Sequence, residues 1–250
     1  MLRQRIIPCL LLNNNALVKT IRFGDEKYLG DPLNAVRIFN EKEIDEIMIL
    51  DINASNLKKE PNYNLISRIA KECKSPITYG GGIQNIQQAE KIISLGVERI
   101  SLCSSIFKSP KIIREISSSF GSQSVVVVLE IISNKKKYET YRFYDNYKYS
   151  DPFILAKDAE DLGAGEIVIS SIDRDGTREG YDIELIKLFK KELSIPVTAL
   201  GGADNIEDIK NLFRSIGIVG AAAGSMFTLT GKFRSVLIQY PTKEEKLKIY

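Results

Sequence analysis

The chain has 250 residues and a mass of 28.1 kDa, which allows one large domain or two small ones. Hydrophobic residues make up 44% of it, enough for a sizeable core and too much for an intrinsically disordered chain. The formal net charge is only +3 and the charges are interspersed, so nothing points to nucleic-acid or lipid partners. We find no apolar run as long as a membrane span and no signal-peptide cleavage site.

The chain contains no histidine, which excludes a Ser-His-Asp triad, a Cys-His pair and an HExxH metal site. Proton transfer near neutral pH must then use Asp, Glu, Lys, Cys, Tyr or water. The three cysteines (Cys9, Cys73 and Cys103) show neither metal-binding spacing nor a disulfide framework, as is typical of a reducing cytosol. We therefore expect a cytoplasmic protein with carboxylates as its first catalytic candidates, and with no metal or other cofactor.

The sequence repeats itself once, at an offset of 120 residues. Residues 31–46 resemble residues 151–166, and residues 76–86 resemble residues 196–206. The matches in the second pair include both glycines of a Gly-Gly dipeptide and the Asn-Ile that follows it. So many matches at one offset indicate two similar structural halves.

Each half contains four short apolar runs without alternation, the pattern of strands buried on both faces of a parallel sheet. Helical patterns separate the runs, and Asp31, Asn85, Asp151 and Asn205 provide helix N-caps. Eight strands alternating with helices in this length predict an α/β fold, a single (β/α)8 TIM barrel over 1–250. Its (βα)4 halves would cover about 1–120 and 121–250, and a doubly wound open sheet is the alternative. The predicted strands are Arg5–Leu12, Glu46–Asp51, Pro76–Tyr79, Arg99–Cys103, Ser124–Glu130, Glu166–Ser171, Pro196–Leu200 and Ile218–Ala223.

Glycines follow several predicted strands at the end where such barrels bind their substrates. Backbone N–H groups approach an anion closely at glycine, and a following helix adds its N-terminal dipole. Matched copies in both halves predict two phosphate sites on opposite sides of the mouth, and thus an elongated ligand. Ordinary tight turns are the alternative for any single pair. The segments are Gly80–Gly82, Ser104–Ser105, Gly201–Gly202 and Gly224–Ser225.

Carboxylates also end the predicted strands: Asp51, Glu130, and Asp173 with Asp175 in SIDRDGT. Carboxylates that converge at one mouth raise each other's pKa, which gives acid and base forms near neutral pH. A simple turn cap is the alternative for the Asp-Gly pair.

A second charged set lies at the opposite end of the predicted strands. Arg5, Glu46, Arg99 and Glu166 stand at strand starts, where they could form an inward-facing ring, the basal ring. Such a ring must be well paired if it is buried, and four ordinary exposed charges are the alternative.

The residues resemble the HisF family, the cyclase subunit of imidazole glycerol phosphate synthase. RIIPCL, LDINAS, GGGI, GAGEI and SIDRDGTREGYD carry the resemblance, which covers nearly the whole chain. It implies a barrel that binds a bisphosphorylated ribonucleotide of histidine biosynthesis and forms a heterodimer with the glutaminase HisH. Ammonia from that partner would pass a charged gate, cross the barrel and enter a reaction that yields imidazole glycerol phosphate and an aminoimidazole carboxamide ribotide.

The resemblance also assigns roles to residues. Asp175 matches an acid/base aspartate, Lys19 matches the lysine of a mobile loop, and Glu130 stands where the family has a strand-5 aspartate. The basal ring matches the ammonia gate, with Arg99 where lysine is usual, and Glu98 matches an acid that faces the glutaminase. The phosphate regions match Gly81, Gly82, Ser104, Gly176, Gly201, Gly202, Gly224 and Ser225.

Three departures change the expected chemistry. The second acid/base aspartate is Leu11, the serine before the strand-7 glycines is Leu200, and a phosphate-region asparagine is Cys103. Losing one of two proton-transfer groups costs general acid–base catalysis about 10²–10⁴-fold. This pattern, with the GKxRxVLIxYP tail at 231–241, resembles HisF-like paralogues encoded with surface-polysaccharide genes. These imply a HisH-like glutaminase and an ATP-dependent sugar amidotransferase as partners, and acetamidino formation on a sugar.

Three hypotheses follow for the function. The first is a HisF-like subunit of such a glutamine amidotransferase system, the second a working histidine-pathway cyclase, and the third a non-catalytic scaffold that activates a glutaminase. Elsewhere, we expect a surface hairpin at Lys135–Tyr149, a long functional loop at Asn13–Gly30 and a charged, solvated end at Lys243–Lys248.

Overall fold

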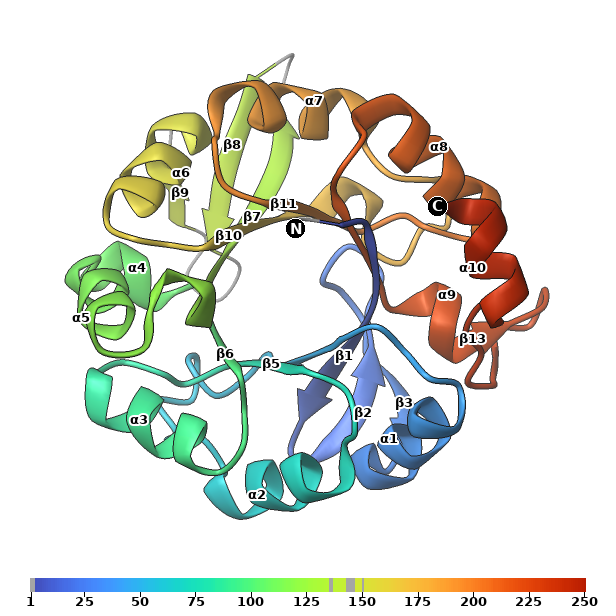
Figure 1. Ribbon diagram of the computed structural model, residues 1–250, viewed down its shortest axis with the longest axis horizontal. Coiled ribbons are helices and arrows are strands. Elements are labelled where there is room, and N and C mark those ends of the chain that lie inside the picture. The colour runs from blue at the N-terminus through green and yellow to red at the C-terminus, as the bar shows by residue number, and fades with distance from the viewer. Residues whose placement is uncertain (1–2, 135–136, 143–146, 150) are drawn as a thin grey trace.

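Eight parallel strands close into a ring in the computed structural model, which describes residues 3–134, 137–142, 147–149 and 151–250. Each strand pairs in parallel with the next, and the last strand pairs with the first (Figure 1). The predicted (β/α)8 barrel is confirmed and the open sheet is wrong. The ring consists of β1 (Arg5–Asn13), β4 (Ile47–Asp51), β5 (Ile77–Gly80), β6 (Arg99–Leu102), β7 (Val125–Asn134), β10 (Glu166–Ser171), β11 (Val197–Leu200) and β12 (Gly220–Ala223).

The predicted strands agree with these bounds to within two residues, except that β7 continues four residues past Glu130. Side chains alternate along each strand. On β1, Ile6 and Leu10 point outward into the large core beneath the helices, while Ile7 and Cys9 belong to a smaller cluster inside the ring. Every position of a strand is therefore covered, which explains the apolar runs without alternation.

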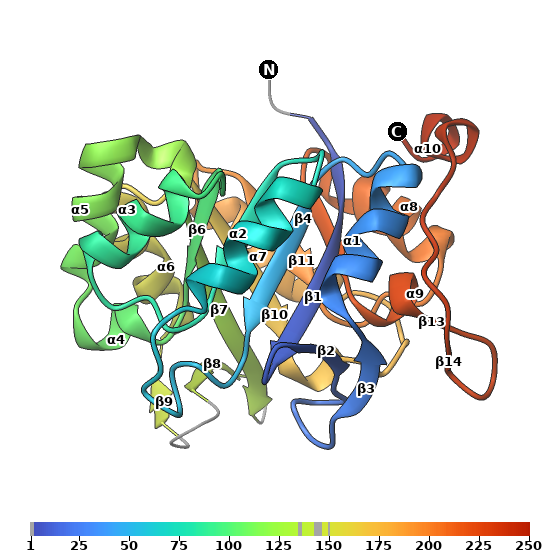
Figure 2. The same ribbon diagram turned by 90° about the horizontal axis from the view of Figure 1, so that it is seen from below.

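Helices surround the ring (Figures 1 and 2), and the predicted N-caps are confirmed: the side chains of Asp31, Asn85, Asp151 and Asn205 each accept a backbone N–H of the first turn. The helices of eight or more residues around the barrel are α1 (Pro32–Glu41), α2 (Tyr63–Glu72), α3 (Ile86–Ser94), α5 (Lys111–Phe120), α6 (Pro152–Asp161), α7 (Ile183–Glu192) and α8 (Ile206–Ile216). The one-turn helices α4 (Ser105–Lys108) and α9 (Ser225–Thr228) follow β6 and β12, and 3₁₀ turns lie at Ser122–Ser124 and Ile172–Arg174.

The two halves repeat each other at the sequence offset. The helices α2 and α7 begin 120 residues apart, as do β5 and β11, and α4 and α9. Elements that correspond in the sequence repeat therefore also correspond in the structure. The division into half-barrels of 1–120 and 121–250 stays a prediction.

Each half also adds an antiparallel extension at the mouth. The segment Asn13–Gly30 is more ordered than the long loop we expected, because it forms β2 (Ala16–Lys19) and β3 (Lys27–Gly30). A turn with left-handed Asn14 and Asn15 joins β1 to β2, as two-residue hairpins require. In the second half, β8 (Lys137–Arg142) pairs antiparallel with β7 and with β9 (Tyr147–Tyr149). The described part of the predicted hairpin is thus confirmed, and residues 135–136 and 143–146 lie outside the described residues.

The C-terminal segment crosses the outside of the barrel from the mouth to the opposite end (Figure 2). It forms the small hairpin of β13 (Leu229–Thr230) and β14 (Ser235–Val236) and then α10 (Lys243–Ile249). The expected charged, solvated end is confirmed over Lys243–Lys248, where all residues except the half-buried Lys246 are exposed. The segment is nevertheless a helix that Thr242 caps, and Ile249, just beyond the predicted range, is buried in the core. Both termini lie at the end of the barrel where the strands begin.

Candidate functional site

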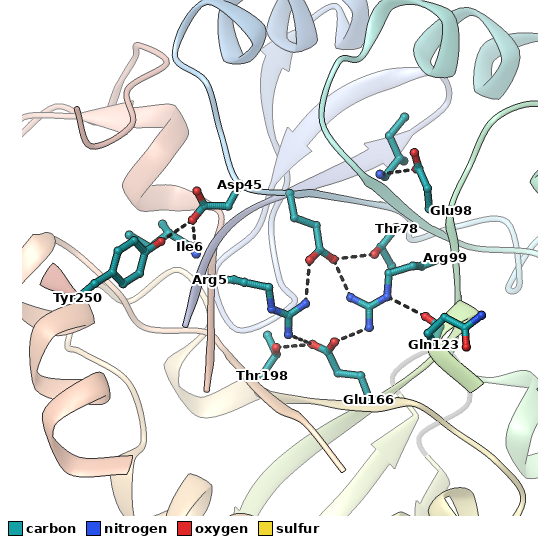
Figure 3. A network of polar contacts seen from close by, with 12 residues as sticks. Arg5, Ile6, Asp45, Thr78, Glu98, Arg99, Gln123, Glu166, Thr198 and Tyr250 are labelled. Atoms are coloured by element: carbon teal, nitrogen blue, oxygen red, sulfur yellow. Dashed lines mark hydrogen bonds and ion pairs between the residues drawn. The ribbon is translucent and has the colours of Figure 1, made fainter. Parts of the chain in front are cut away.

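The four residues of the basal ring meet inside the barrel at the starts of the strands (Figure 3). Arg5 donates Nη1 to Glu46 at 2.8 Å and Nη2 to Glu166 at 3.0 Å. Arg99 donates Nη1 to Glu46 at 2.9 Å, and its Nη2 contacts Glu166. Each carboxylate therefore bridges both guanidinium groups, and the ring closes on itself. The alternative of four ordinary exposed charges is wrong.

Two threonines complete the ring. Thr78 donates its hydroxyl to Glu46 at 2.9 Å, and Thr198 donates to Glu166. Burial alone would raise the pKa of Glu166, but Arg99 and Arg5 overcome it and hold that pKa below its usual range. Burial likewise works against the charged form of Arg5, while both glutamates raise its pKa above the usual value. Every charged group of the ring is thus paired with one of the opposite sign.

Above the ring, the inside of the barrel is apolar. Ile7, Met48, Val126, Val168 and Ala222 form the buried inner cluster between the ring and the mouth. A small neutral molecule crosses such a layer at far lower cost than an ion, because an unpaired charge loses its hydration there.

A cavity of about 350 Å³ opens at the mouth, the mouth cavity. Its walls come from loops after most of the barrel strands, which is where catalysis occurs in this fold. The lining includes the predicted residues Lys19, Gly81, Gly82, Ser104, Glu130, Asp175 and Gly224, together with Leu11, Leu200 and Cys103.

Asp175 is the centre of a closed cluster within this mouth. Its Oδ1 accepts Lys19 Nζ at 2.6 Å, and its Oδ2 accepts the Thr20 hydroxyl at 2.9 Å and the Phe23 N–H at 3.4 Å. The N–H of Arg22 also donates to the Asp175 carbonyl at 2.9 Å. The segment after β2 therefore covers Asp175, which is only 7% exposed. A ligand must displace part of this cover to reach the carboxylate.

The other predicted carboxylates separate in the structure. Asp51 and Glu130 line the mouth cavity, whereas Asp173 turns away and accepts the N–H of Ser133 at 2.7 Å. Burial raises the pKa of Asp51, although the N–H groups of Asn53 and Ala54 work against this shift. Asp51 therefore holds its proton to a higher pH than an ordinary aspartate does.

The first-half phosphate region faces the mouth cavity. Gly81 and Gly82 have positive φ, and a Cβ on either would lie within 2.8 Å of a backbone carbonyl oxygen. Only glycine fits there, so the turn approaches the cavity without side chains. Beside it, the Ser104 hydroxyl donates to Ser55 at 2.9 Å.

The second-half region is more enclosed. Gly224 lines the mouth cavity, but Gly176, Gly201 and Gly202 pack against neighbouring loops, with the space for a Gly202 Cβ taken by the Gly180 carbonyl. Ser225 is 5% exposed, and its hydroxyl has no hydrogen-bond partner among the described residues. A buried orphan hydroxyl at a helix start is a place where an anion fits.

The three residues that the resemblance marks as departures also lie at the mouth. Leu11, Leu200 and Cys103 line the cavity and pack on the inner cluster below it. Proton transfer by Leu11 is excluded by its chemistry. Among the described lining residues, Glu26 is an additional acid, and it accepts a hydrogen bond from Asn13 at the rim.

Glu98 lies outside the cavity on the face around the basal ring. It is exposed, and its carboxylate accepts the Ile77 N–H at 2.8 Å (Figure 3). Its role toward a partner stays a prediction.

Sequence reasoning missed Thr78, Thr198, Thr20 and Glu26. The two threonines carried a usable signal, because they match each other at the repeat offset, as do Glu46 and Glu166. No comparable signal marked Thr20, whose contact with Asp175 depends on how the segment after β2 folds back.

Comparison with known proteins fits this geometry. The model of a family described as histidine biosynthesis protein matches residues 5–234. A Leptospira borgpetersenii protein, provisionally named imidazole glycerol phosphate synthase subunit HisF, is 51% identical over the full length of both chains. The chain belongs to the HisF family. A Vibrio vulnificus protein with the provisional name subunit hisF3 is 48% identical over 99% of this chain and 96% of its own. The imidazole glycerol phosphate synthase subunit HisF of Lactococcus lactis subsp. lactis is 38% identical over 91% and 89%.

The described residues of this HisF-family chain contain neither a membrane-spanning helix nor a cluster of metal-binding side chains. None of its described helices is long and apolar enough to cross a membrane. Within the same residues, no three His, Cys, Asp or Glu side chains gather where they could hold a metal ion.

Proposed function

We propose that this protein is a HisF-like barrel subunit of a cytoplasmic glutamine amidotransferase system. It receives ammonia from a HisH-like glutaminase at its basal face and supports amidation of a sugar, with an acetamidino group on a surface polysaccharide as the product. An ATP-dependent sugar amidotransferase is the proposed third component.

The observation that carries the proposal is the contrast along the barrel axis. The basal ring and the apolar inner cluster provide what ammonia transfer needs: a paired entrance and a path without fixed charges. At the mouth, Leu11 and Leu200 line the cavity at positions where the resemblance implies an acid/base aspartate and a serine. Ammonia transfer needs neither of the missing groups, because the partner completes glutamine hydrolysis itself.

The tail and the relatives give further support. Arg234, within the GKxRxVLIxYP motif, donates to the Gly176 carbonyl at 3.0 Å, so the motif braces the loop that carries Asp175. Several of the more similar relatives carry numbered names such as hisF2 and hisF3, as additional copies of a gene do.

The deciding assay gives the purified chain ammonium salt and the ribonucleotide intermediate of histidine biosynthesis. We expect turnover at least 100-fold below that of a HisF cyclase assayed in parallel. The same preparation mixed with the HisH-like glutaminase encoded nearest to it should form a heterodimer. Turnover close to that of the parallel cyclase would overturn the proposal.

A histidine-pathway cyclase is the second candidate. The Lys19–Asp175 pair and the orphan hydroxyl of Ser225 favour it, because both sit where the second phosphate region is expected. In that case Glu130 shares the proton transfer with Asp175. A scaffold without catalysis would instead leave the glutaminase activity of the complex unchanged in Asp175→Asn, with no phosphate ligand bound.

A further inference from the structure

The floor of the mouth cavity is apolar on the side of the first two strands. Leu11 and Leu50 are register partners on β1 and β4, so their side chains lie next to each other. Both are partly exposed to the cavity, and both rest on the buried inner cluster. Together they present a continuous aliphatic surface to whatever occupies the cavity.

Leu200 extends this surface from another strand. It is the register partner of Ala222 on β12, and it packs on the same inner cluster as Leu11 and Leu50. The three leucines form the leucine floor. Cys9 lies beneath it, and burial raises the pKa of its thiol to about 12, as expected for surroundings of low polarity.

Polar groups of the mouth cavity lie around this floor, and Ser170, which also lines the cavity, is the register partner of Leu200. Gly81 and Gly82 with the Ser55–Ser104 hydroxyl pair line one wall, while Glu130 and Asp175 belong to the second half. A bound molecule that spans these walls necessarily places part of its surface on the leucine floor. A hydroxyl group over Leu11 and Leu50 would lose its water without gaining a partner from either side chain, whereas an alkyl group gains apolar contact.

We infer that the mouth cavity takes a phosphate monoester whose remaining part presents an alkyl or methyl-bearing face to Leu11, Leu50 and Leu200, in place of a polyhydroxylated ribonucleotide. The inference deepens the proposed function, on which it rests, by naming the ligand class of the same cavity. It makes the leucine floor a determinant of specificity.

The test compares two probes of the same length, propyl phosphate and glycerol 3-phosphate, by isothermal titration calorimetry. They differ only in two hydroxyl groups. We expect the unmodified chain to bind propyl phosphate about tenfold more tightly, the discrimination that apolar pockets achieve. In Leu200→Ser the ratio should fall to about threefold or less, because the new hydroxyl offers glycerol phosphate a partner.

Three further variants make the result decisive. Leu188→Ser, on the outer face of α7, should keep the tenfold ratio. Leu11→Met keeps the volume and apolar character of the floor, so it should also keep the tenfold ratio. This variant still tests the floor if Leu200→Ser fails to fold. Ser104→Ala should weaken both probes by a similar factor, which places the phosphate on the first-half wall.

Equal affinity for the two probes, tighter binding of glycerol 3-phosphate, or no binding of either at millimolar concentration would each overturn the inference. Because binding is measured without turnover, this outcome is independent of the cyclase assay. A chain that makes imidazole glycerol phosphate would overturn both the proposed function and this inference, whereas a chain that makes none and binds the two probes equally would overturn the inference alone.

Discussion

The two ends of this barrel treat charge in opposite ways. At the basal end, two arginines and two glutamates satisfy one another inside the ring of strands, with Thr78 and Thr198 completing the set. At the mouth, the ion pair of Lys19 and Asp175 is strongly buried, and Leu11, Leu50 and Leu200 line the cavity.

The two ends differ in whether their polar groups are all paired when no ligand is bound. A closed ring of charges needs no ligand, because every carboxylate already has its partners. A mouth must leave groups unsatisfied for a ligand, and the orphan hydroxyl of Ser225 is such a group. At the basal end the charged groups are therefore all paired within the protein, whereas the mouth keeps a polar group unpaired.

Removing one arginine from the basal ring should have the largest effect. In Arg99→Met, Glu46 and Glu166 keep only Arg5 as a cationic partner, although both are almost fully buried. We expect a loss of about 3 kcal/mol in the free energy of unfolding, measured with urea, because a buried charge is left uncompensated. Lys187→Met, which breaks an exposed pair on α7, should cost less than about 0.5 kcal/mol. Equal losses in the two variants would mean that the ring is no more stabilising than a surface pair.

The pH dependence of stability should come from the same ring. In the folded chain the pKa of Glu166 is held below its usual value, while the unfolded side chain titrates near its ordinary pKa of about 4.3. Its contribution is therefore present above about pH 4.3 and is lost as the pH falls through the folded-state pKa. Urea unfolding between pH 3 and pH 7 should show this loss, and a smaller one in Arg99→Met. An identical pH slope in the variant would contradict the role of Arg99.

Introducing a carboxylate at position 11 should change activity instead of stability. Leu11→Asp places an acid in a cavity that Glu130 and Asp175 already line, where neighbouring carboxylates raise one another's pKa. With ammonium salt and the histidine-pathway intermediate, we expect turnover at least about tenfold above the parent chain. Leu11→Asn has the same shape without a titrating proton and should give no gain. If the parent chain already turns over the intermediate as fast as a HisF cyclase, Leu11 does not limit proton transfer at the mouth.

Packing around the rim can be tested with two glycines of similar backbone conformation. Gly202 (φ +100°) and Gly217 (φ +84°) both lie in the left-handed region. A Cβ at Gly202 would lie 2.1 Å from the Gly180 carbonyl oxygen, whereas nothing lies within 4 Å of one at Gly217. Gly217→Ala should therefore cost about 1 kcal/mol for backbone strain alone, and Gly202→Ala about 2 kcal/mol more. Similar losses of unfolding free energy in the two variants would show that the loop at Gly180 moves aside at little cost.

Much of the fold was predictable, because periodic and local signals determine it. Apolar runs and the repeat offset led to the barrel strands within two residues, except for the end of β7, and caps such as Asp31 and Asn205 marked where helices begin. The ring was predictable only as a set of charges at strand starts, since pairing depends on barrel closure. The cover over Asp175 was not predictable, because it depends on left-handed Arg22 and Phe23, which no local rule places. The docking of α10 was missed because its burial comes from residues 200 positions away in the chain, such as Asp45.

The smallest effect should come from the support behind the basal ring. Asp45 precedes Glu46, and its Oδ2 accepts the N–H of Ile6, the residue after Arg5, at 3.1 Å (Figure 3). The Tyr250 hydroxyl also donates to Asp45, while the Tyr250 ring stacks on Phe213 at 5.9 Å between centroids.

Tyr250→Phe keeps the stacked ring and removes only the hydroxyl, and Asp45 retains Lys246 at 2.8 Å as a partner. The expected loss is therefore about 1 kcal/mol in urea unfolding. Tyr240→Phe is the matched change, because that hydroxyl is buried between the Ile6 carbonyl and the Asp45 N–H and should cost about 2 kcal/mol. Hydrogen exchange at the Ile6 amide should speed up in both. Unchanged exchange at the Ile6 amide would show that these two hydroxyls do not stabilise the start of β1. The four charges of the basal ring would then stabilise this end of the barrel without support from α10.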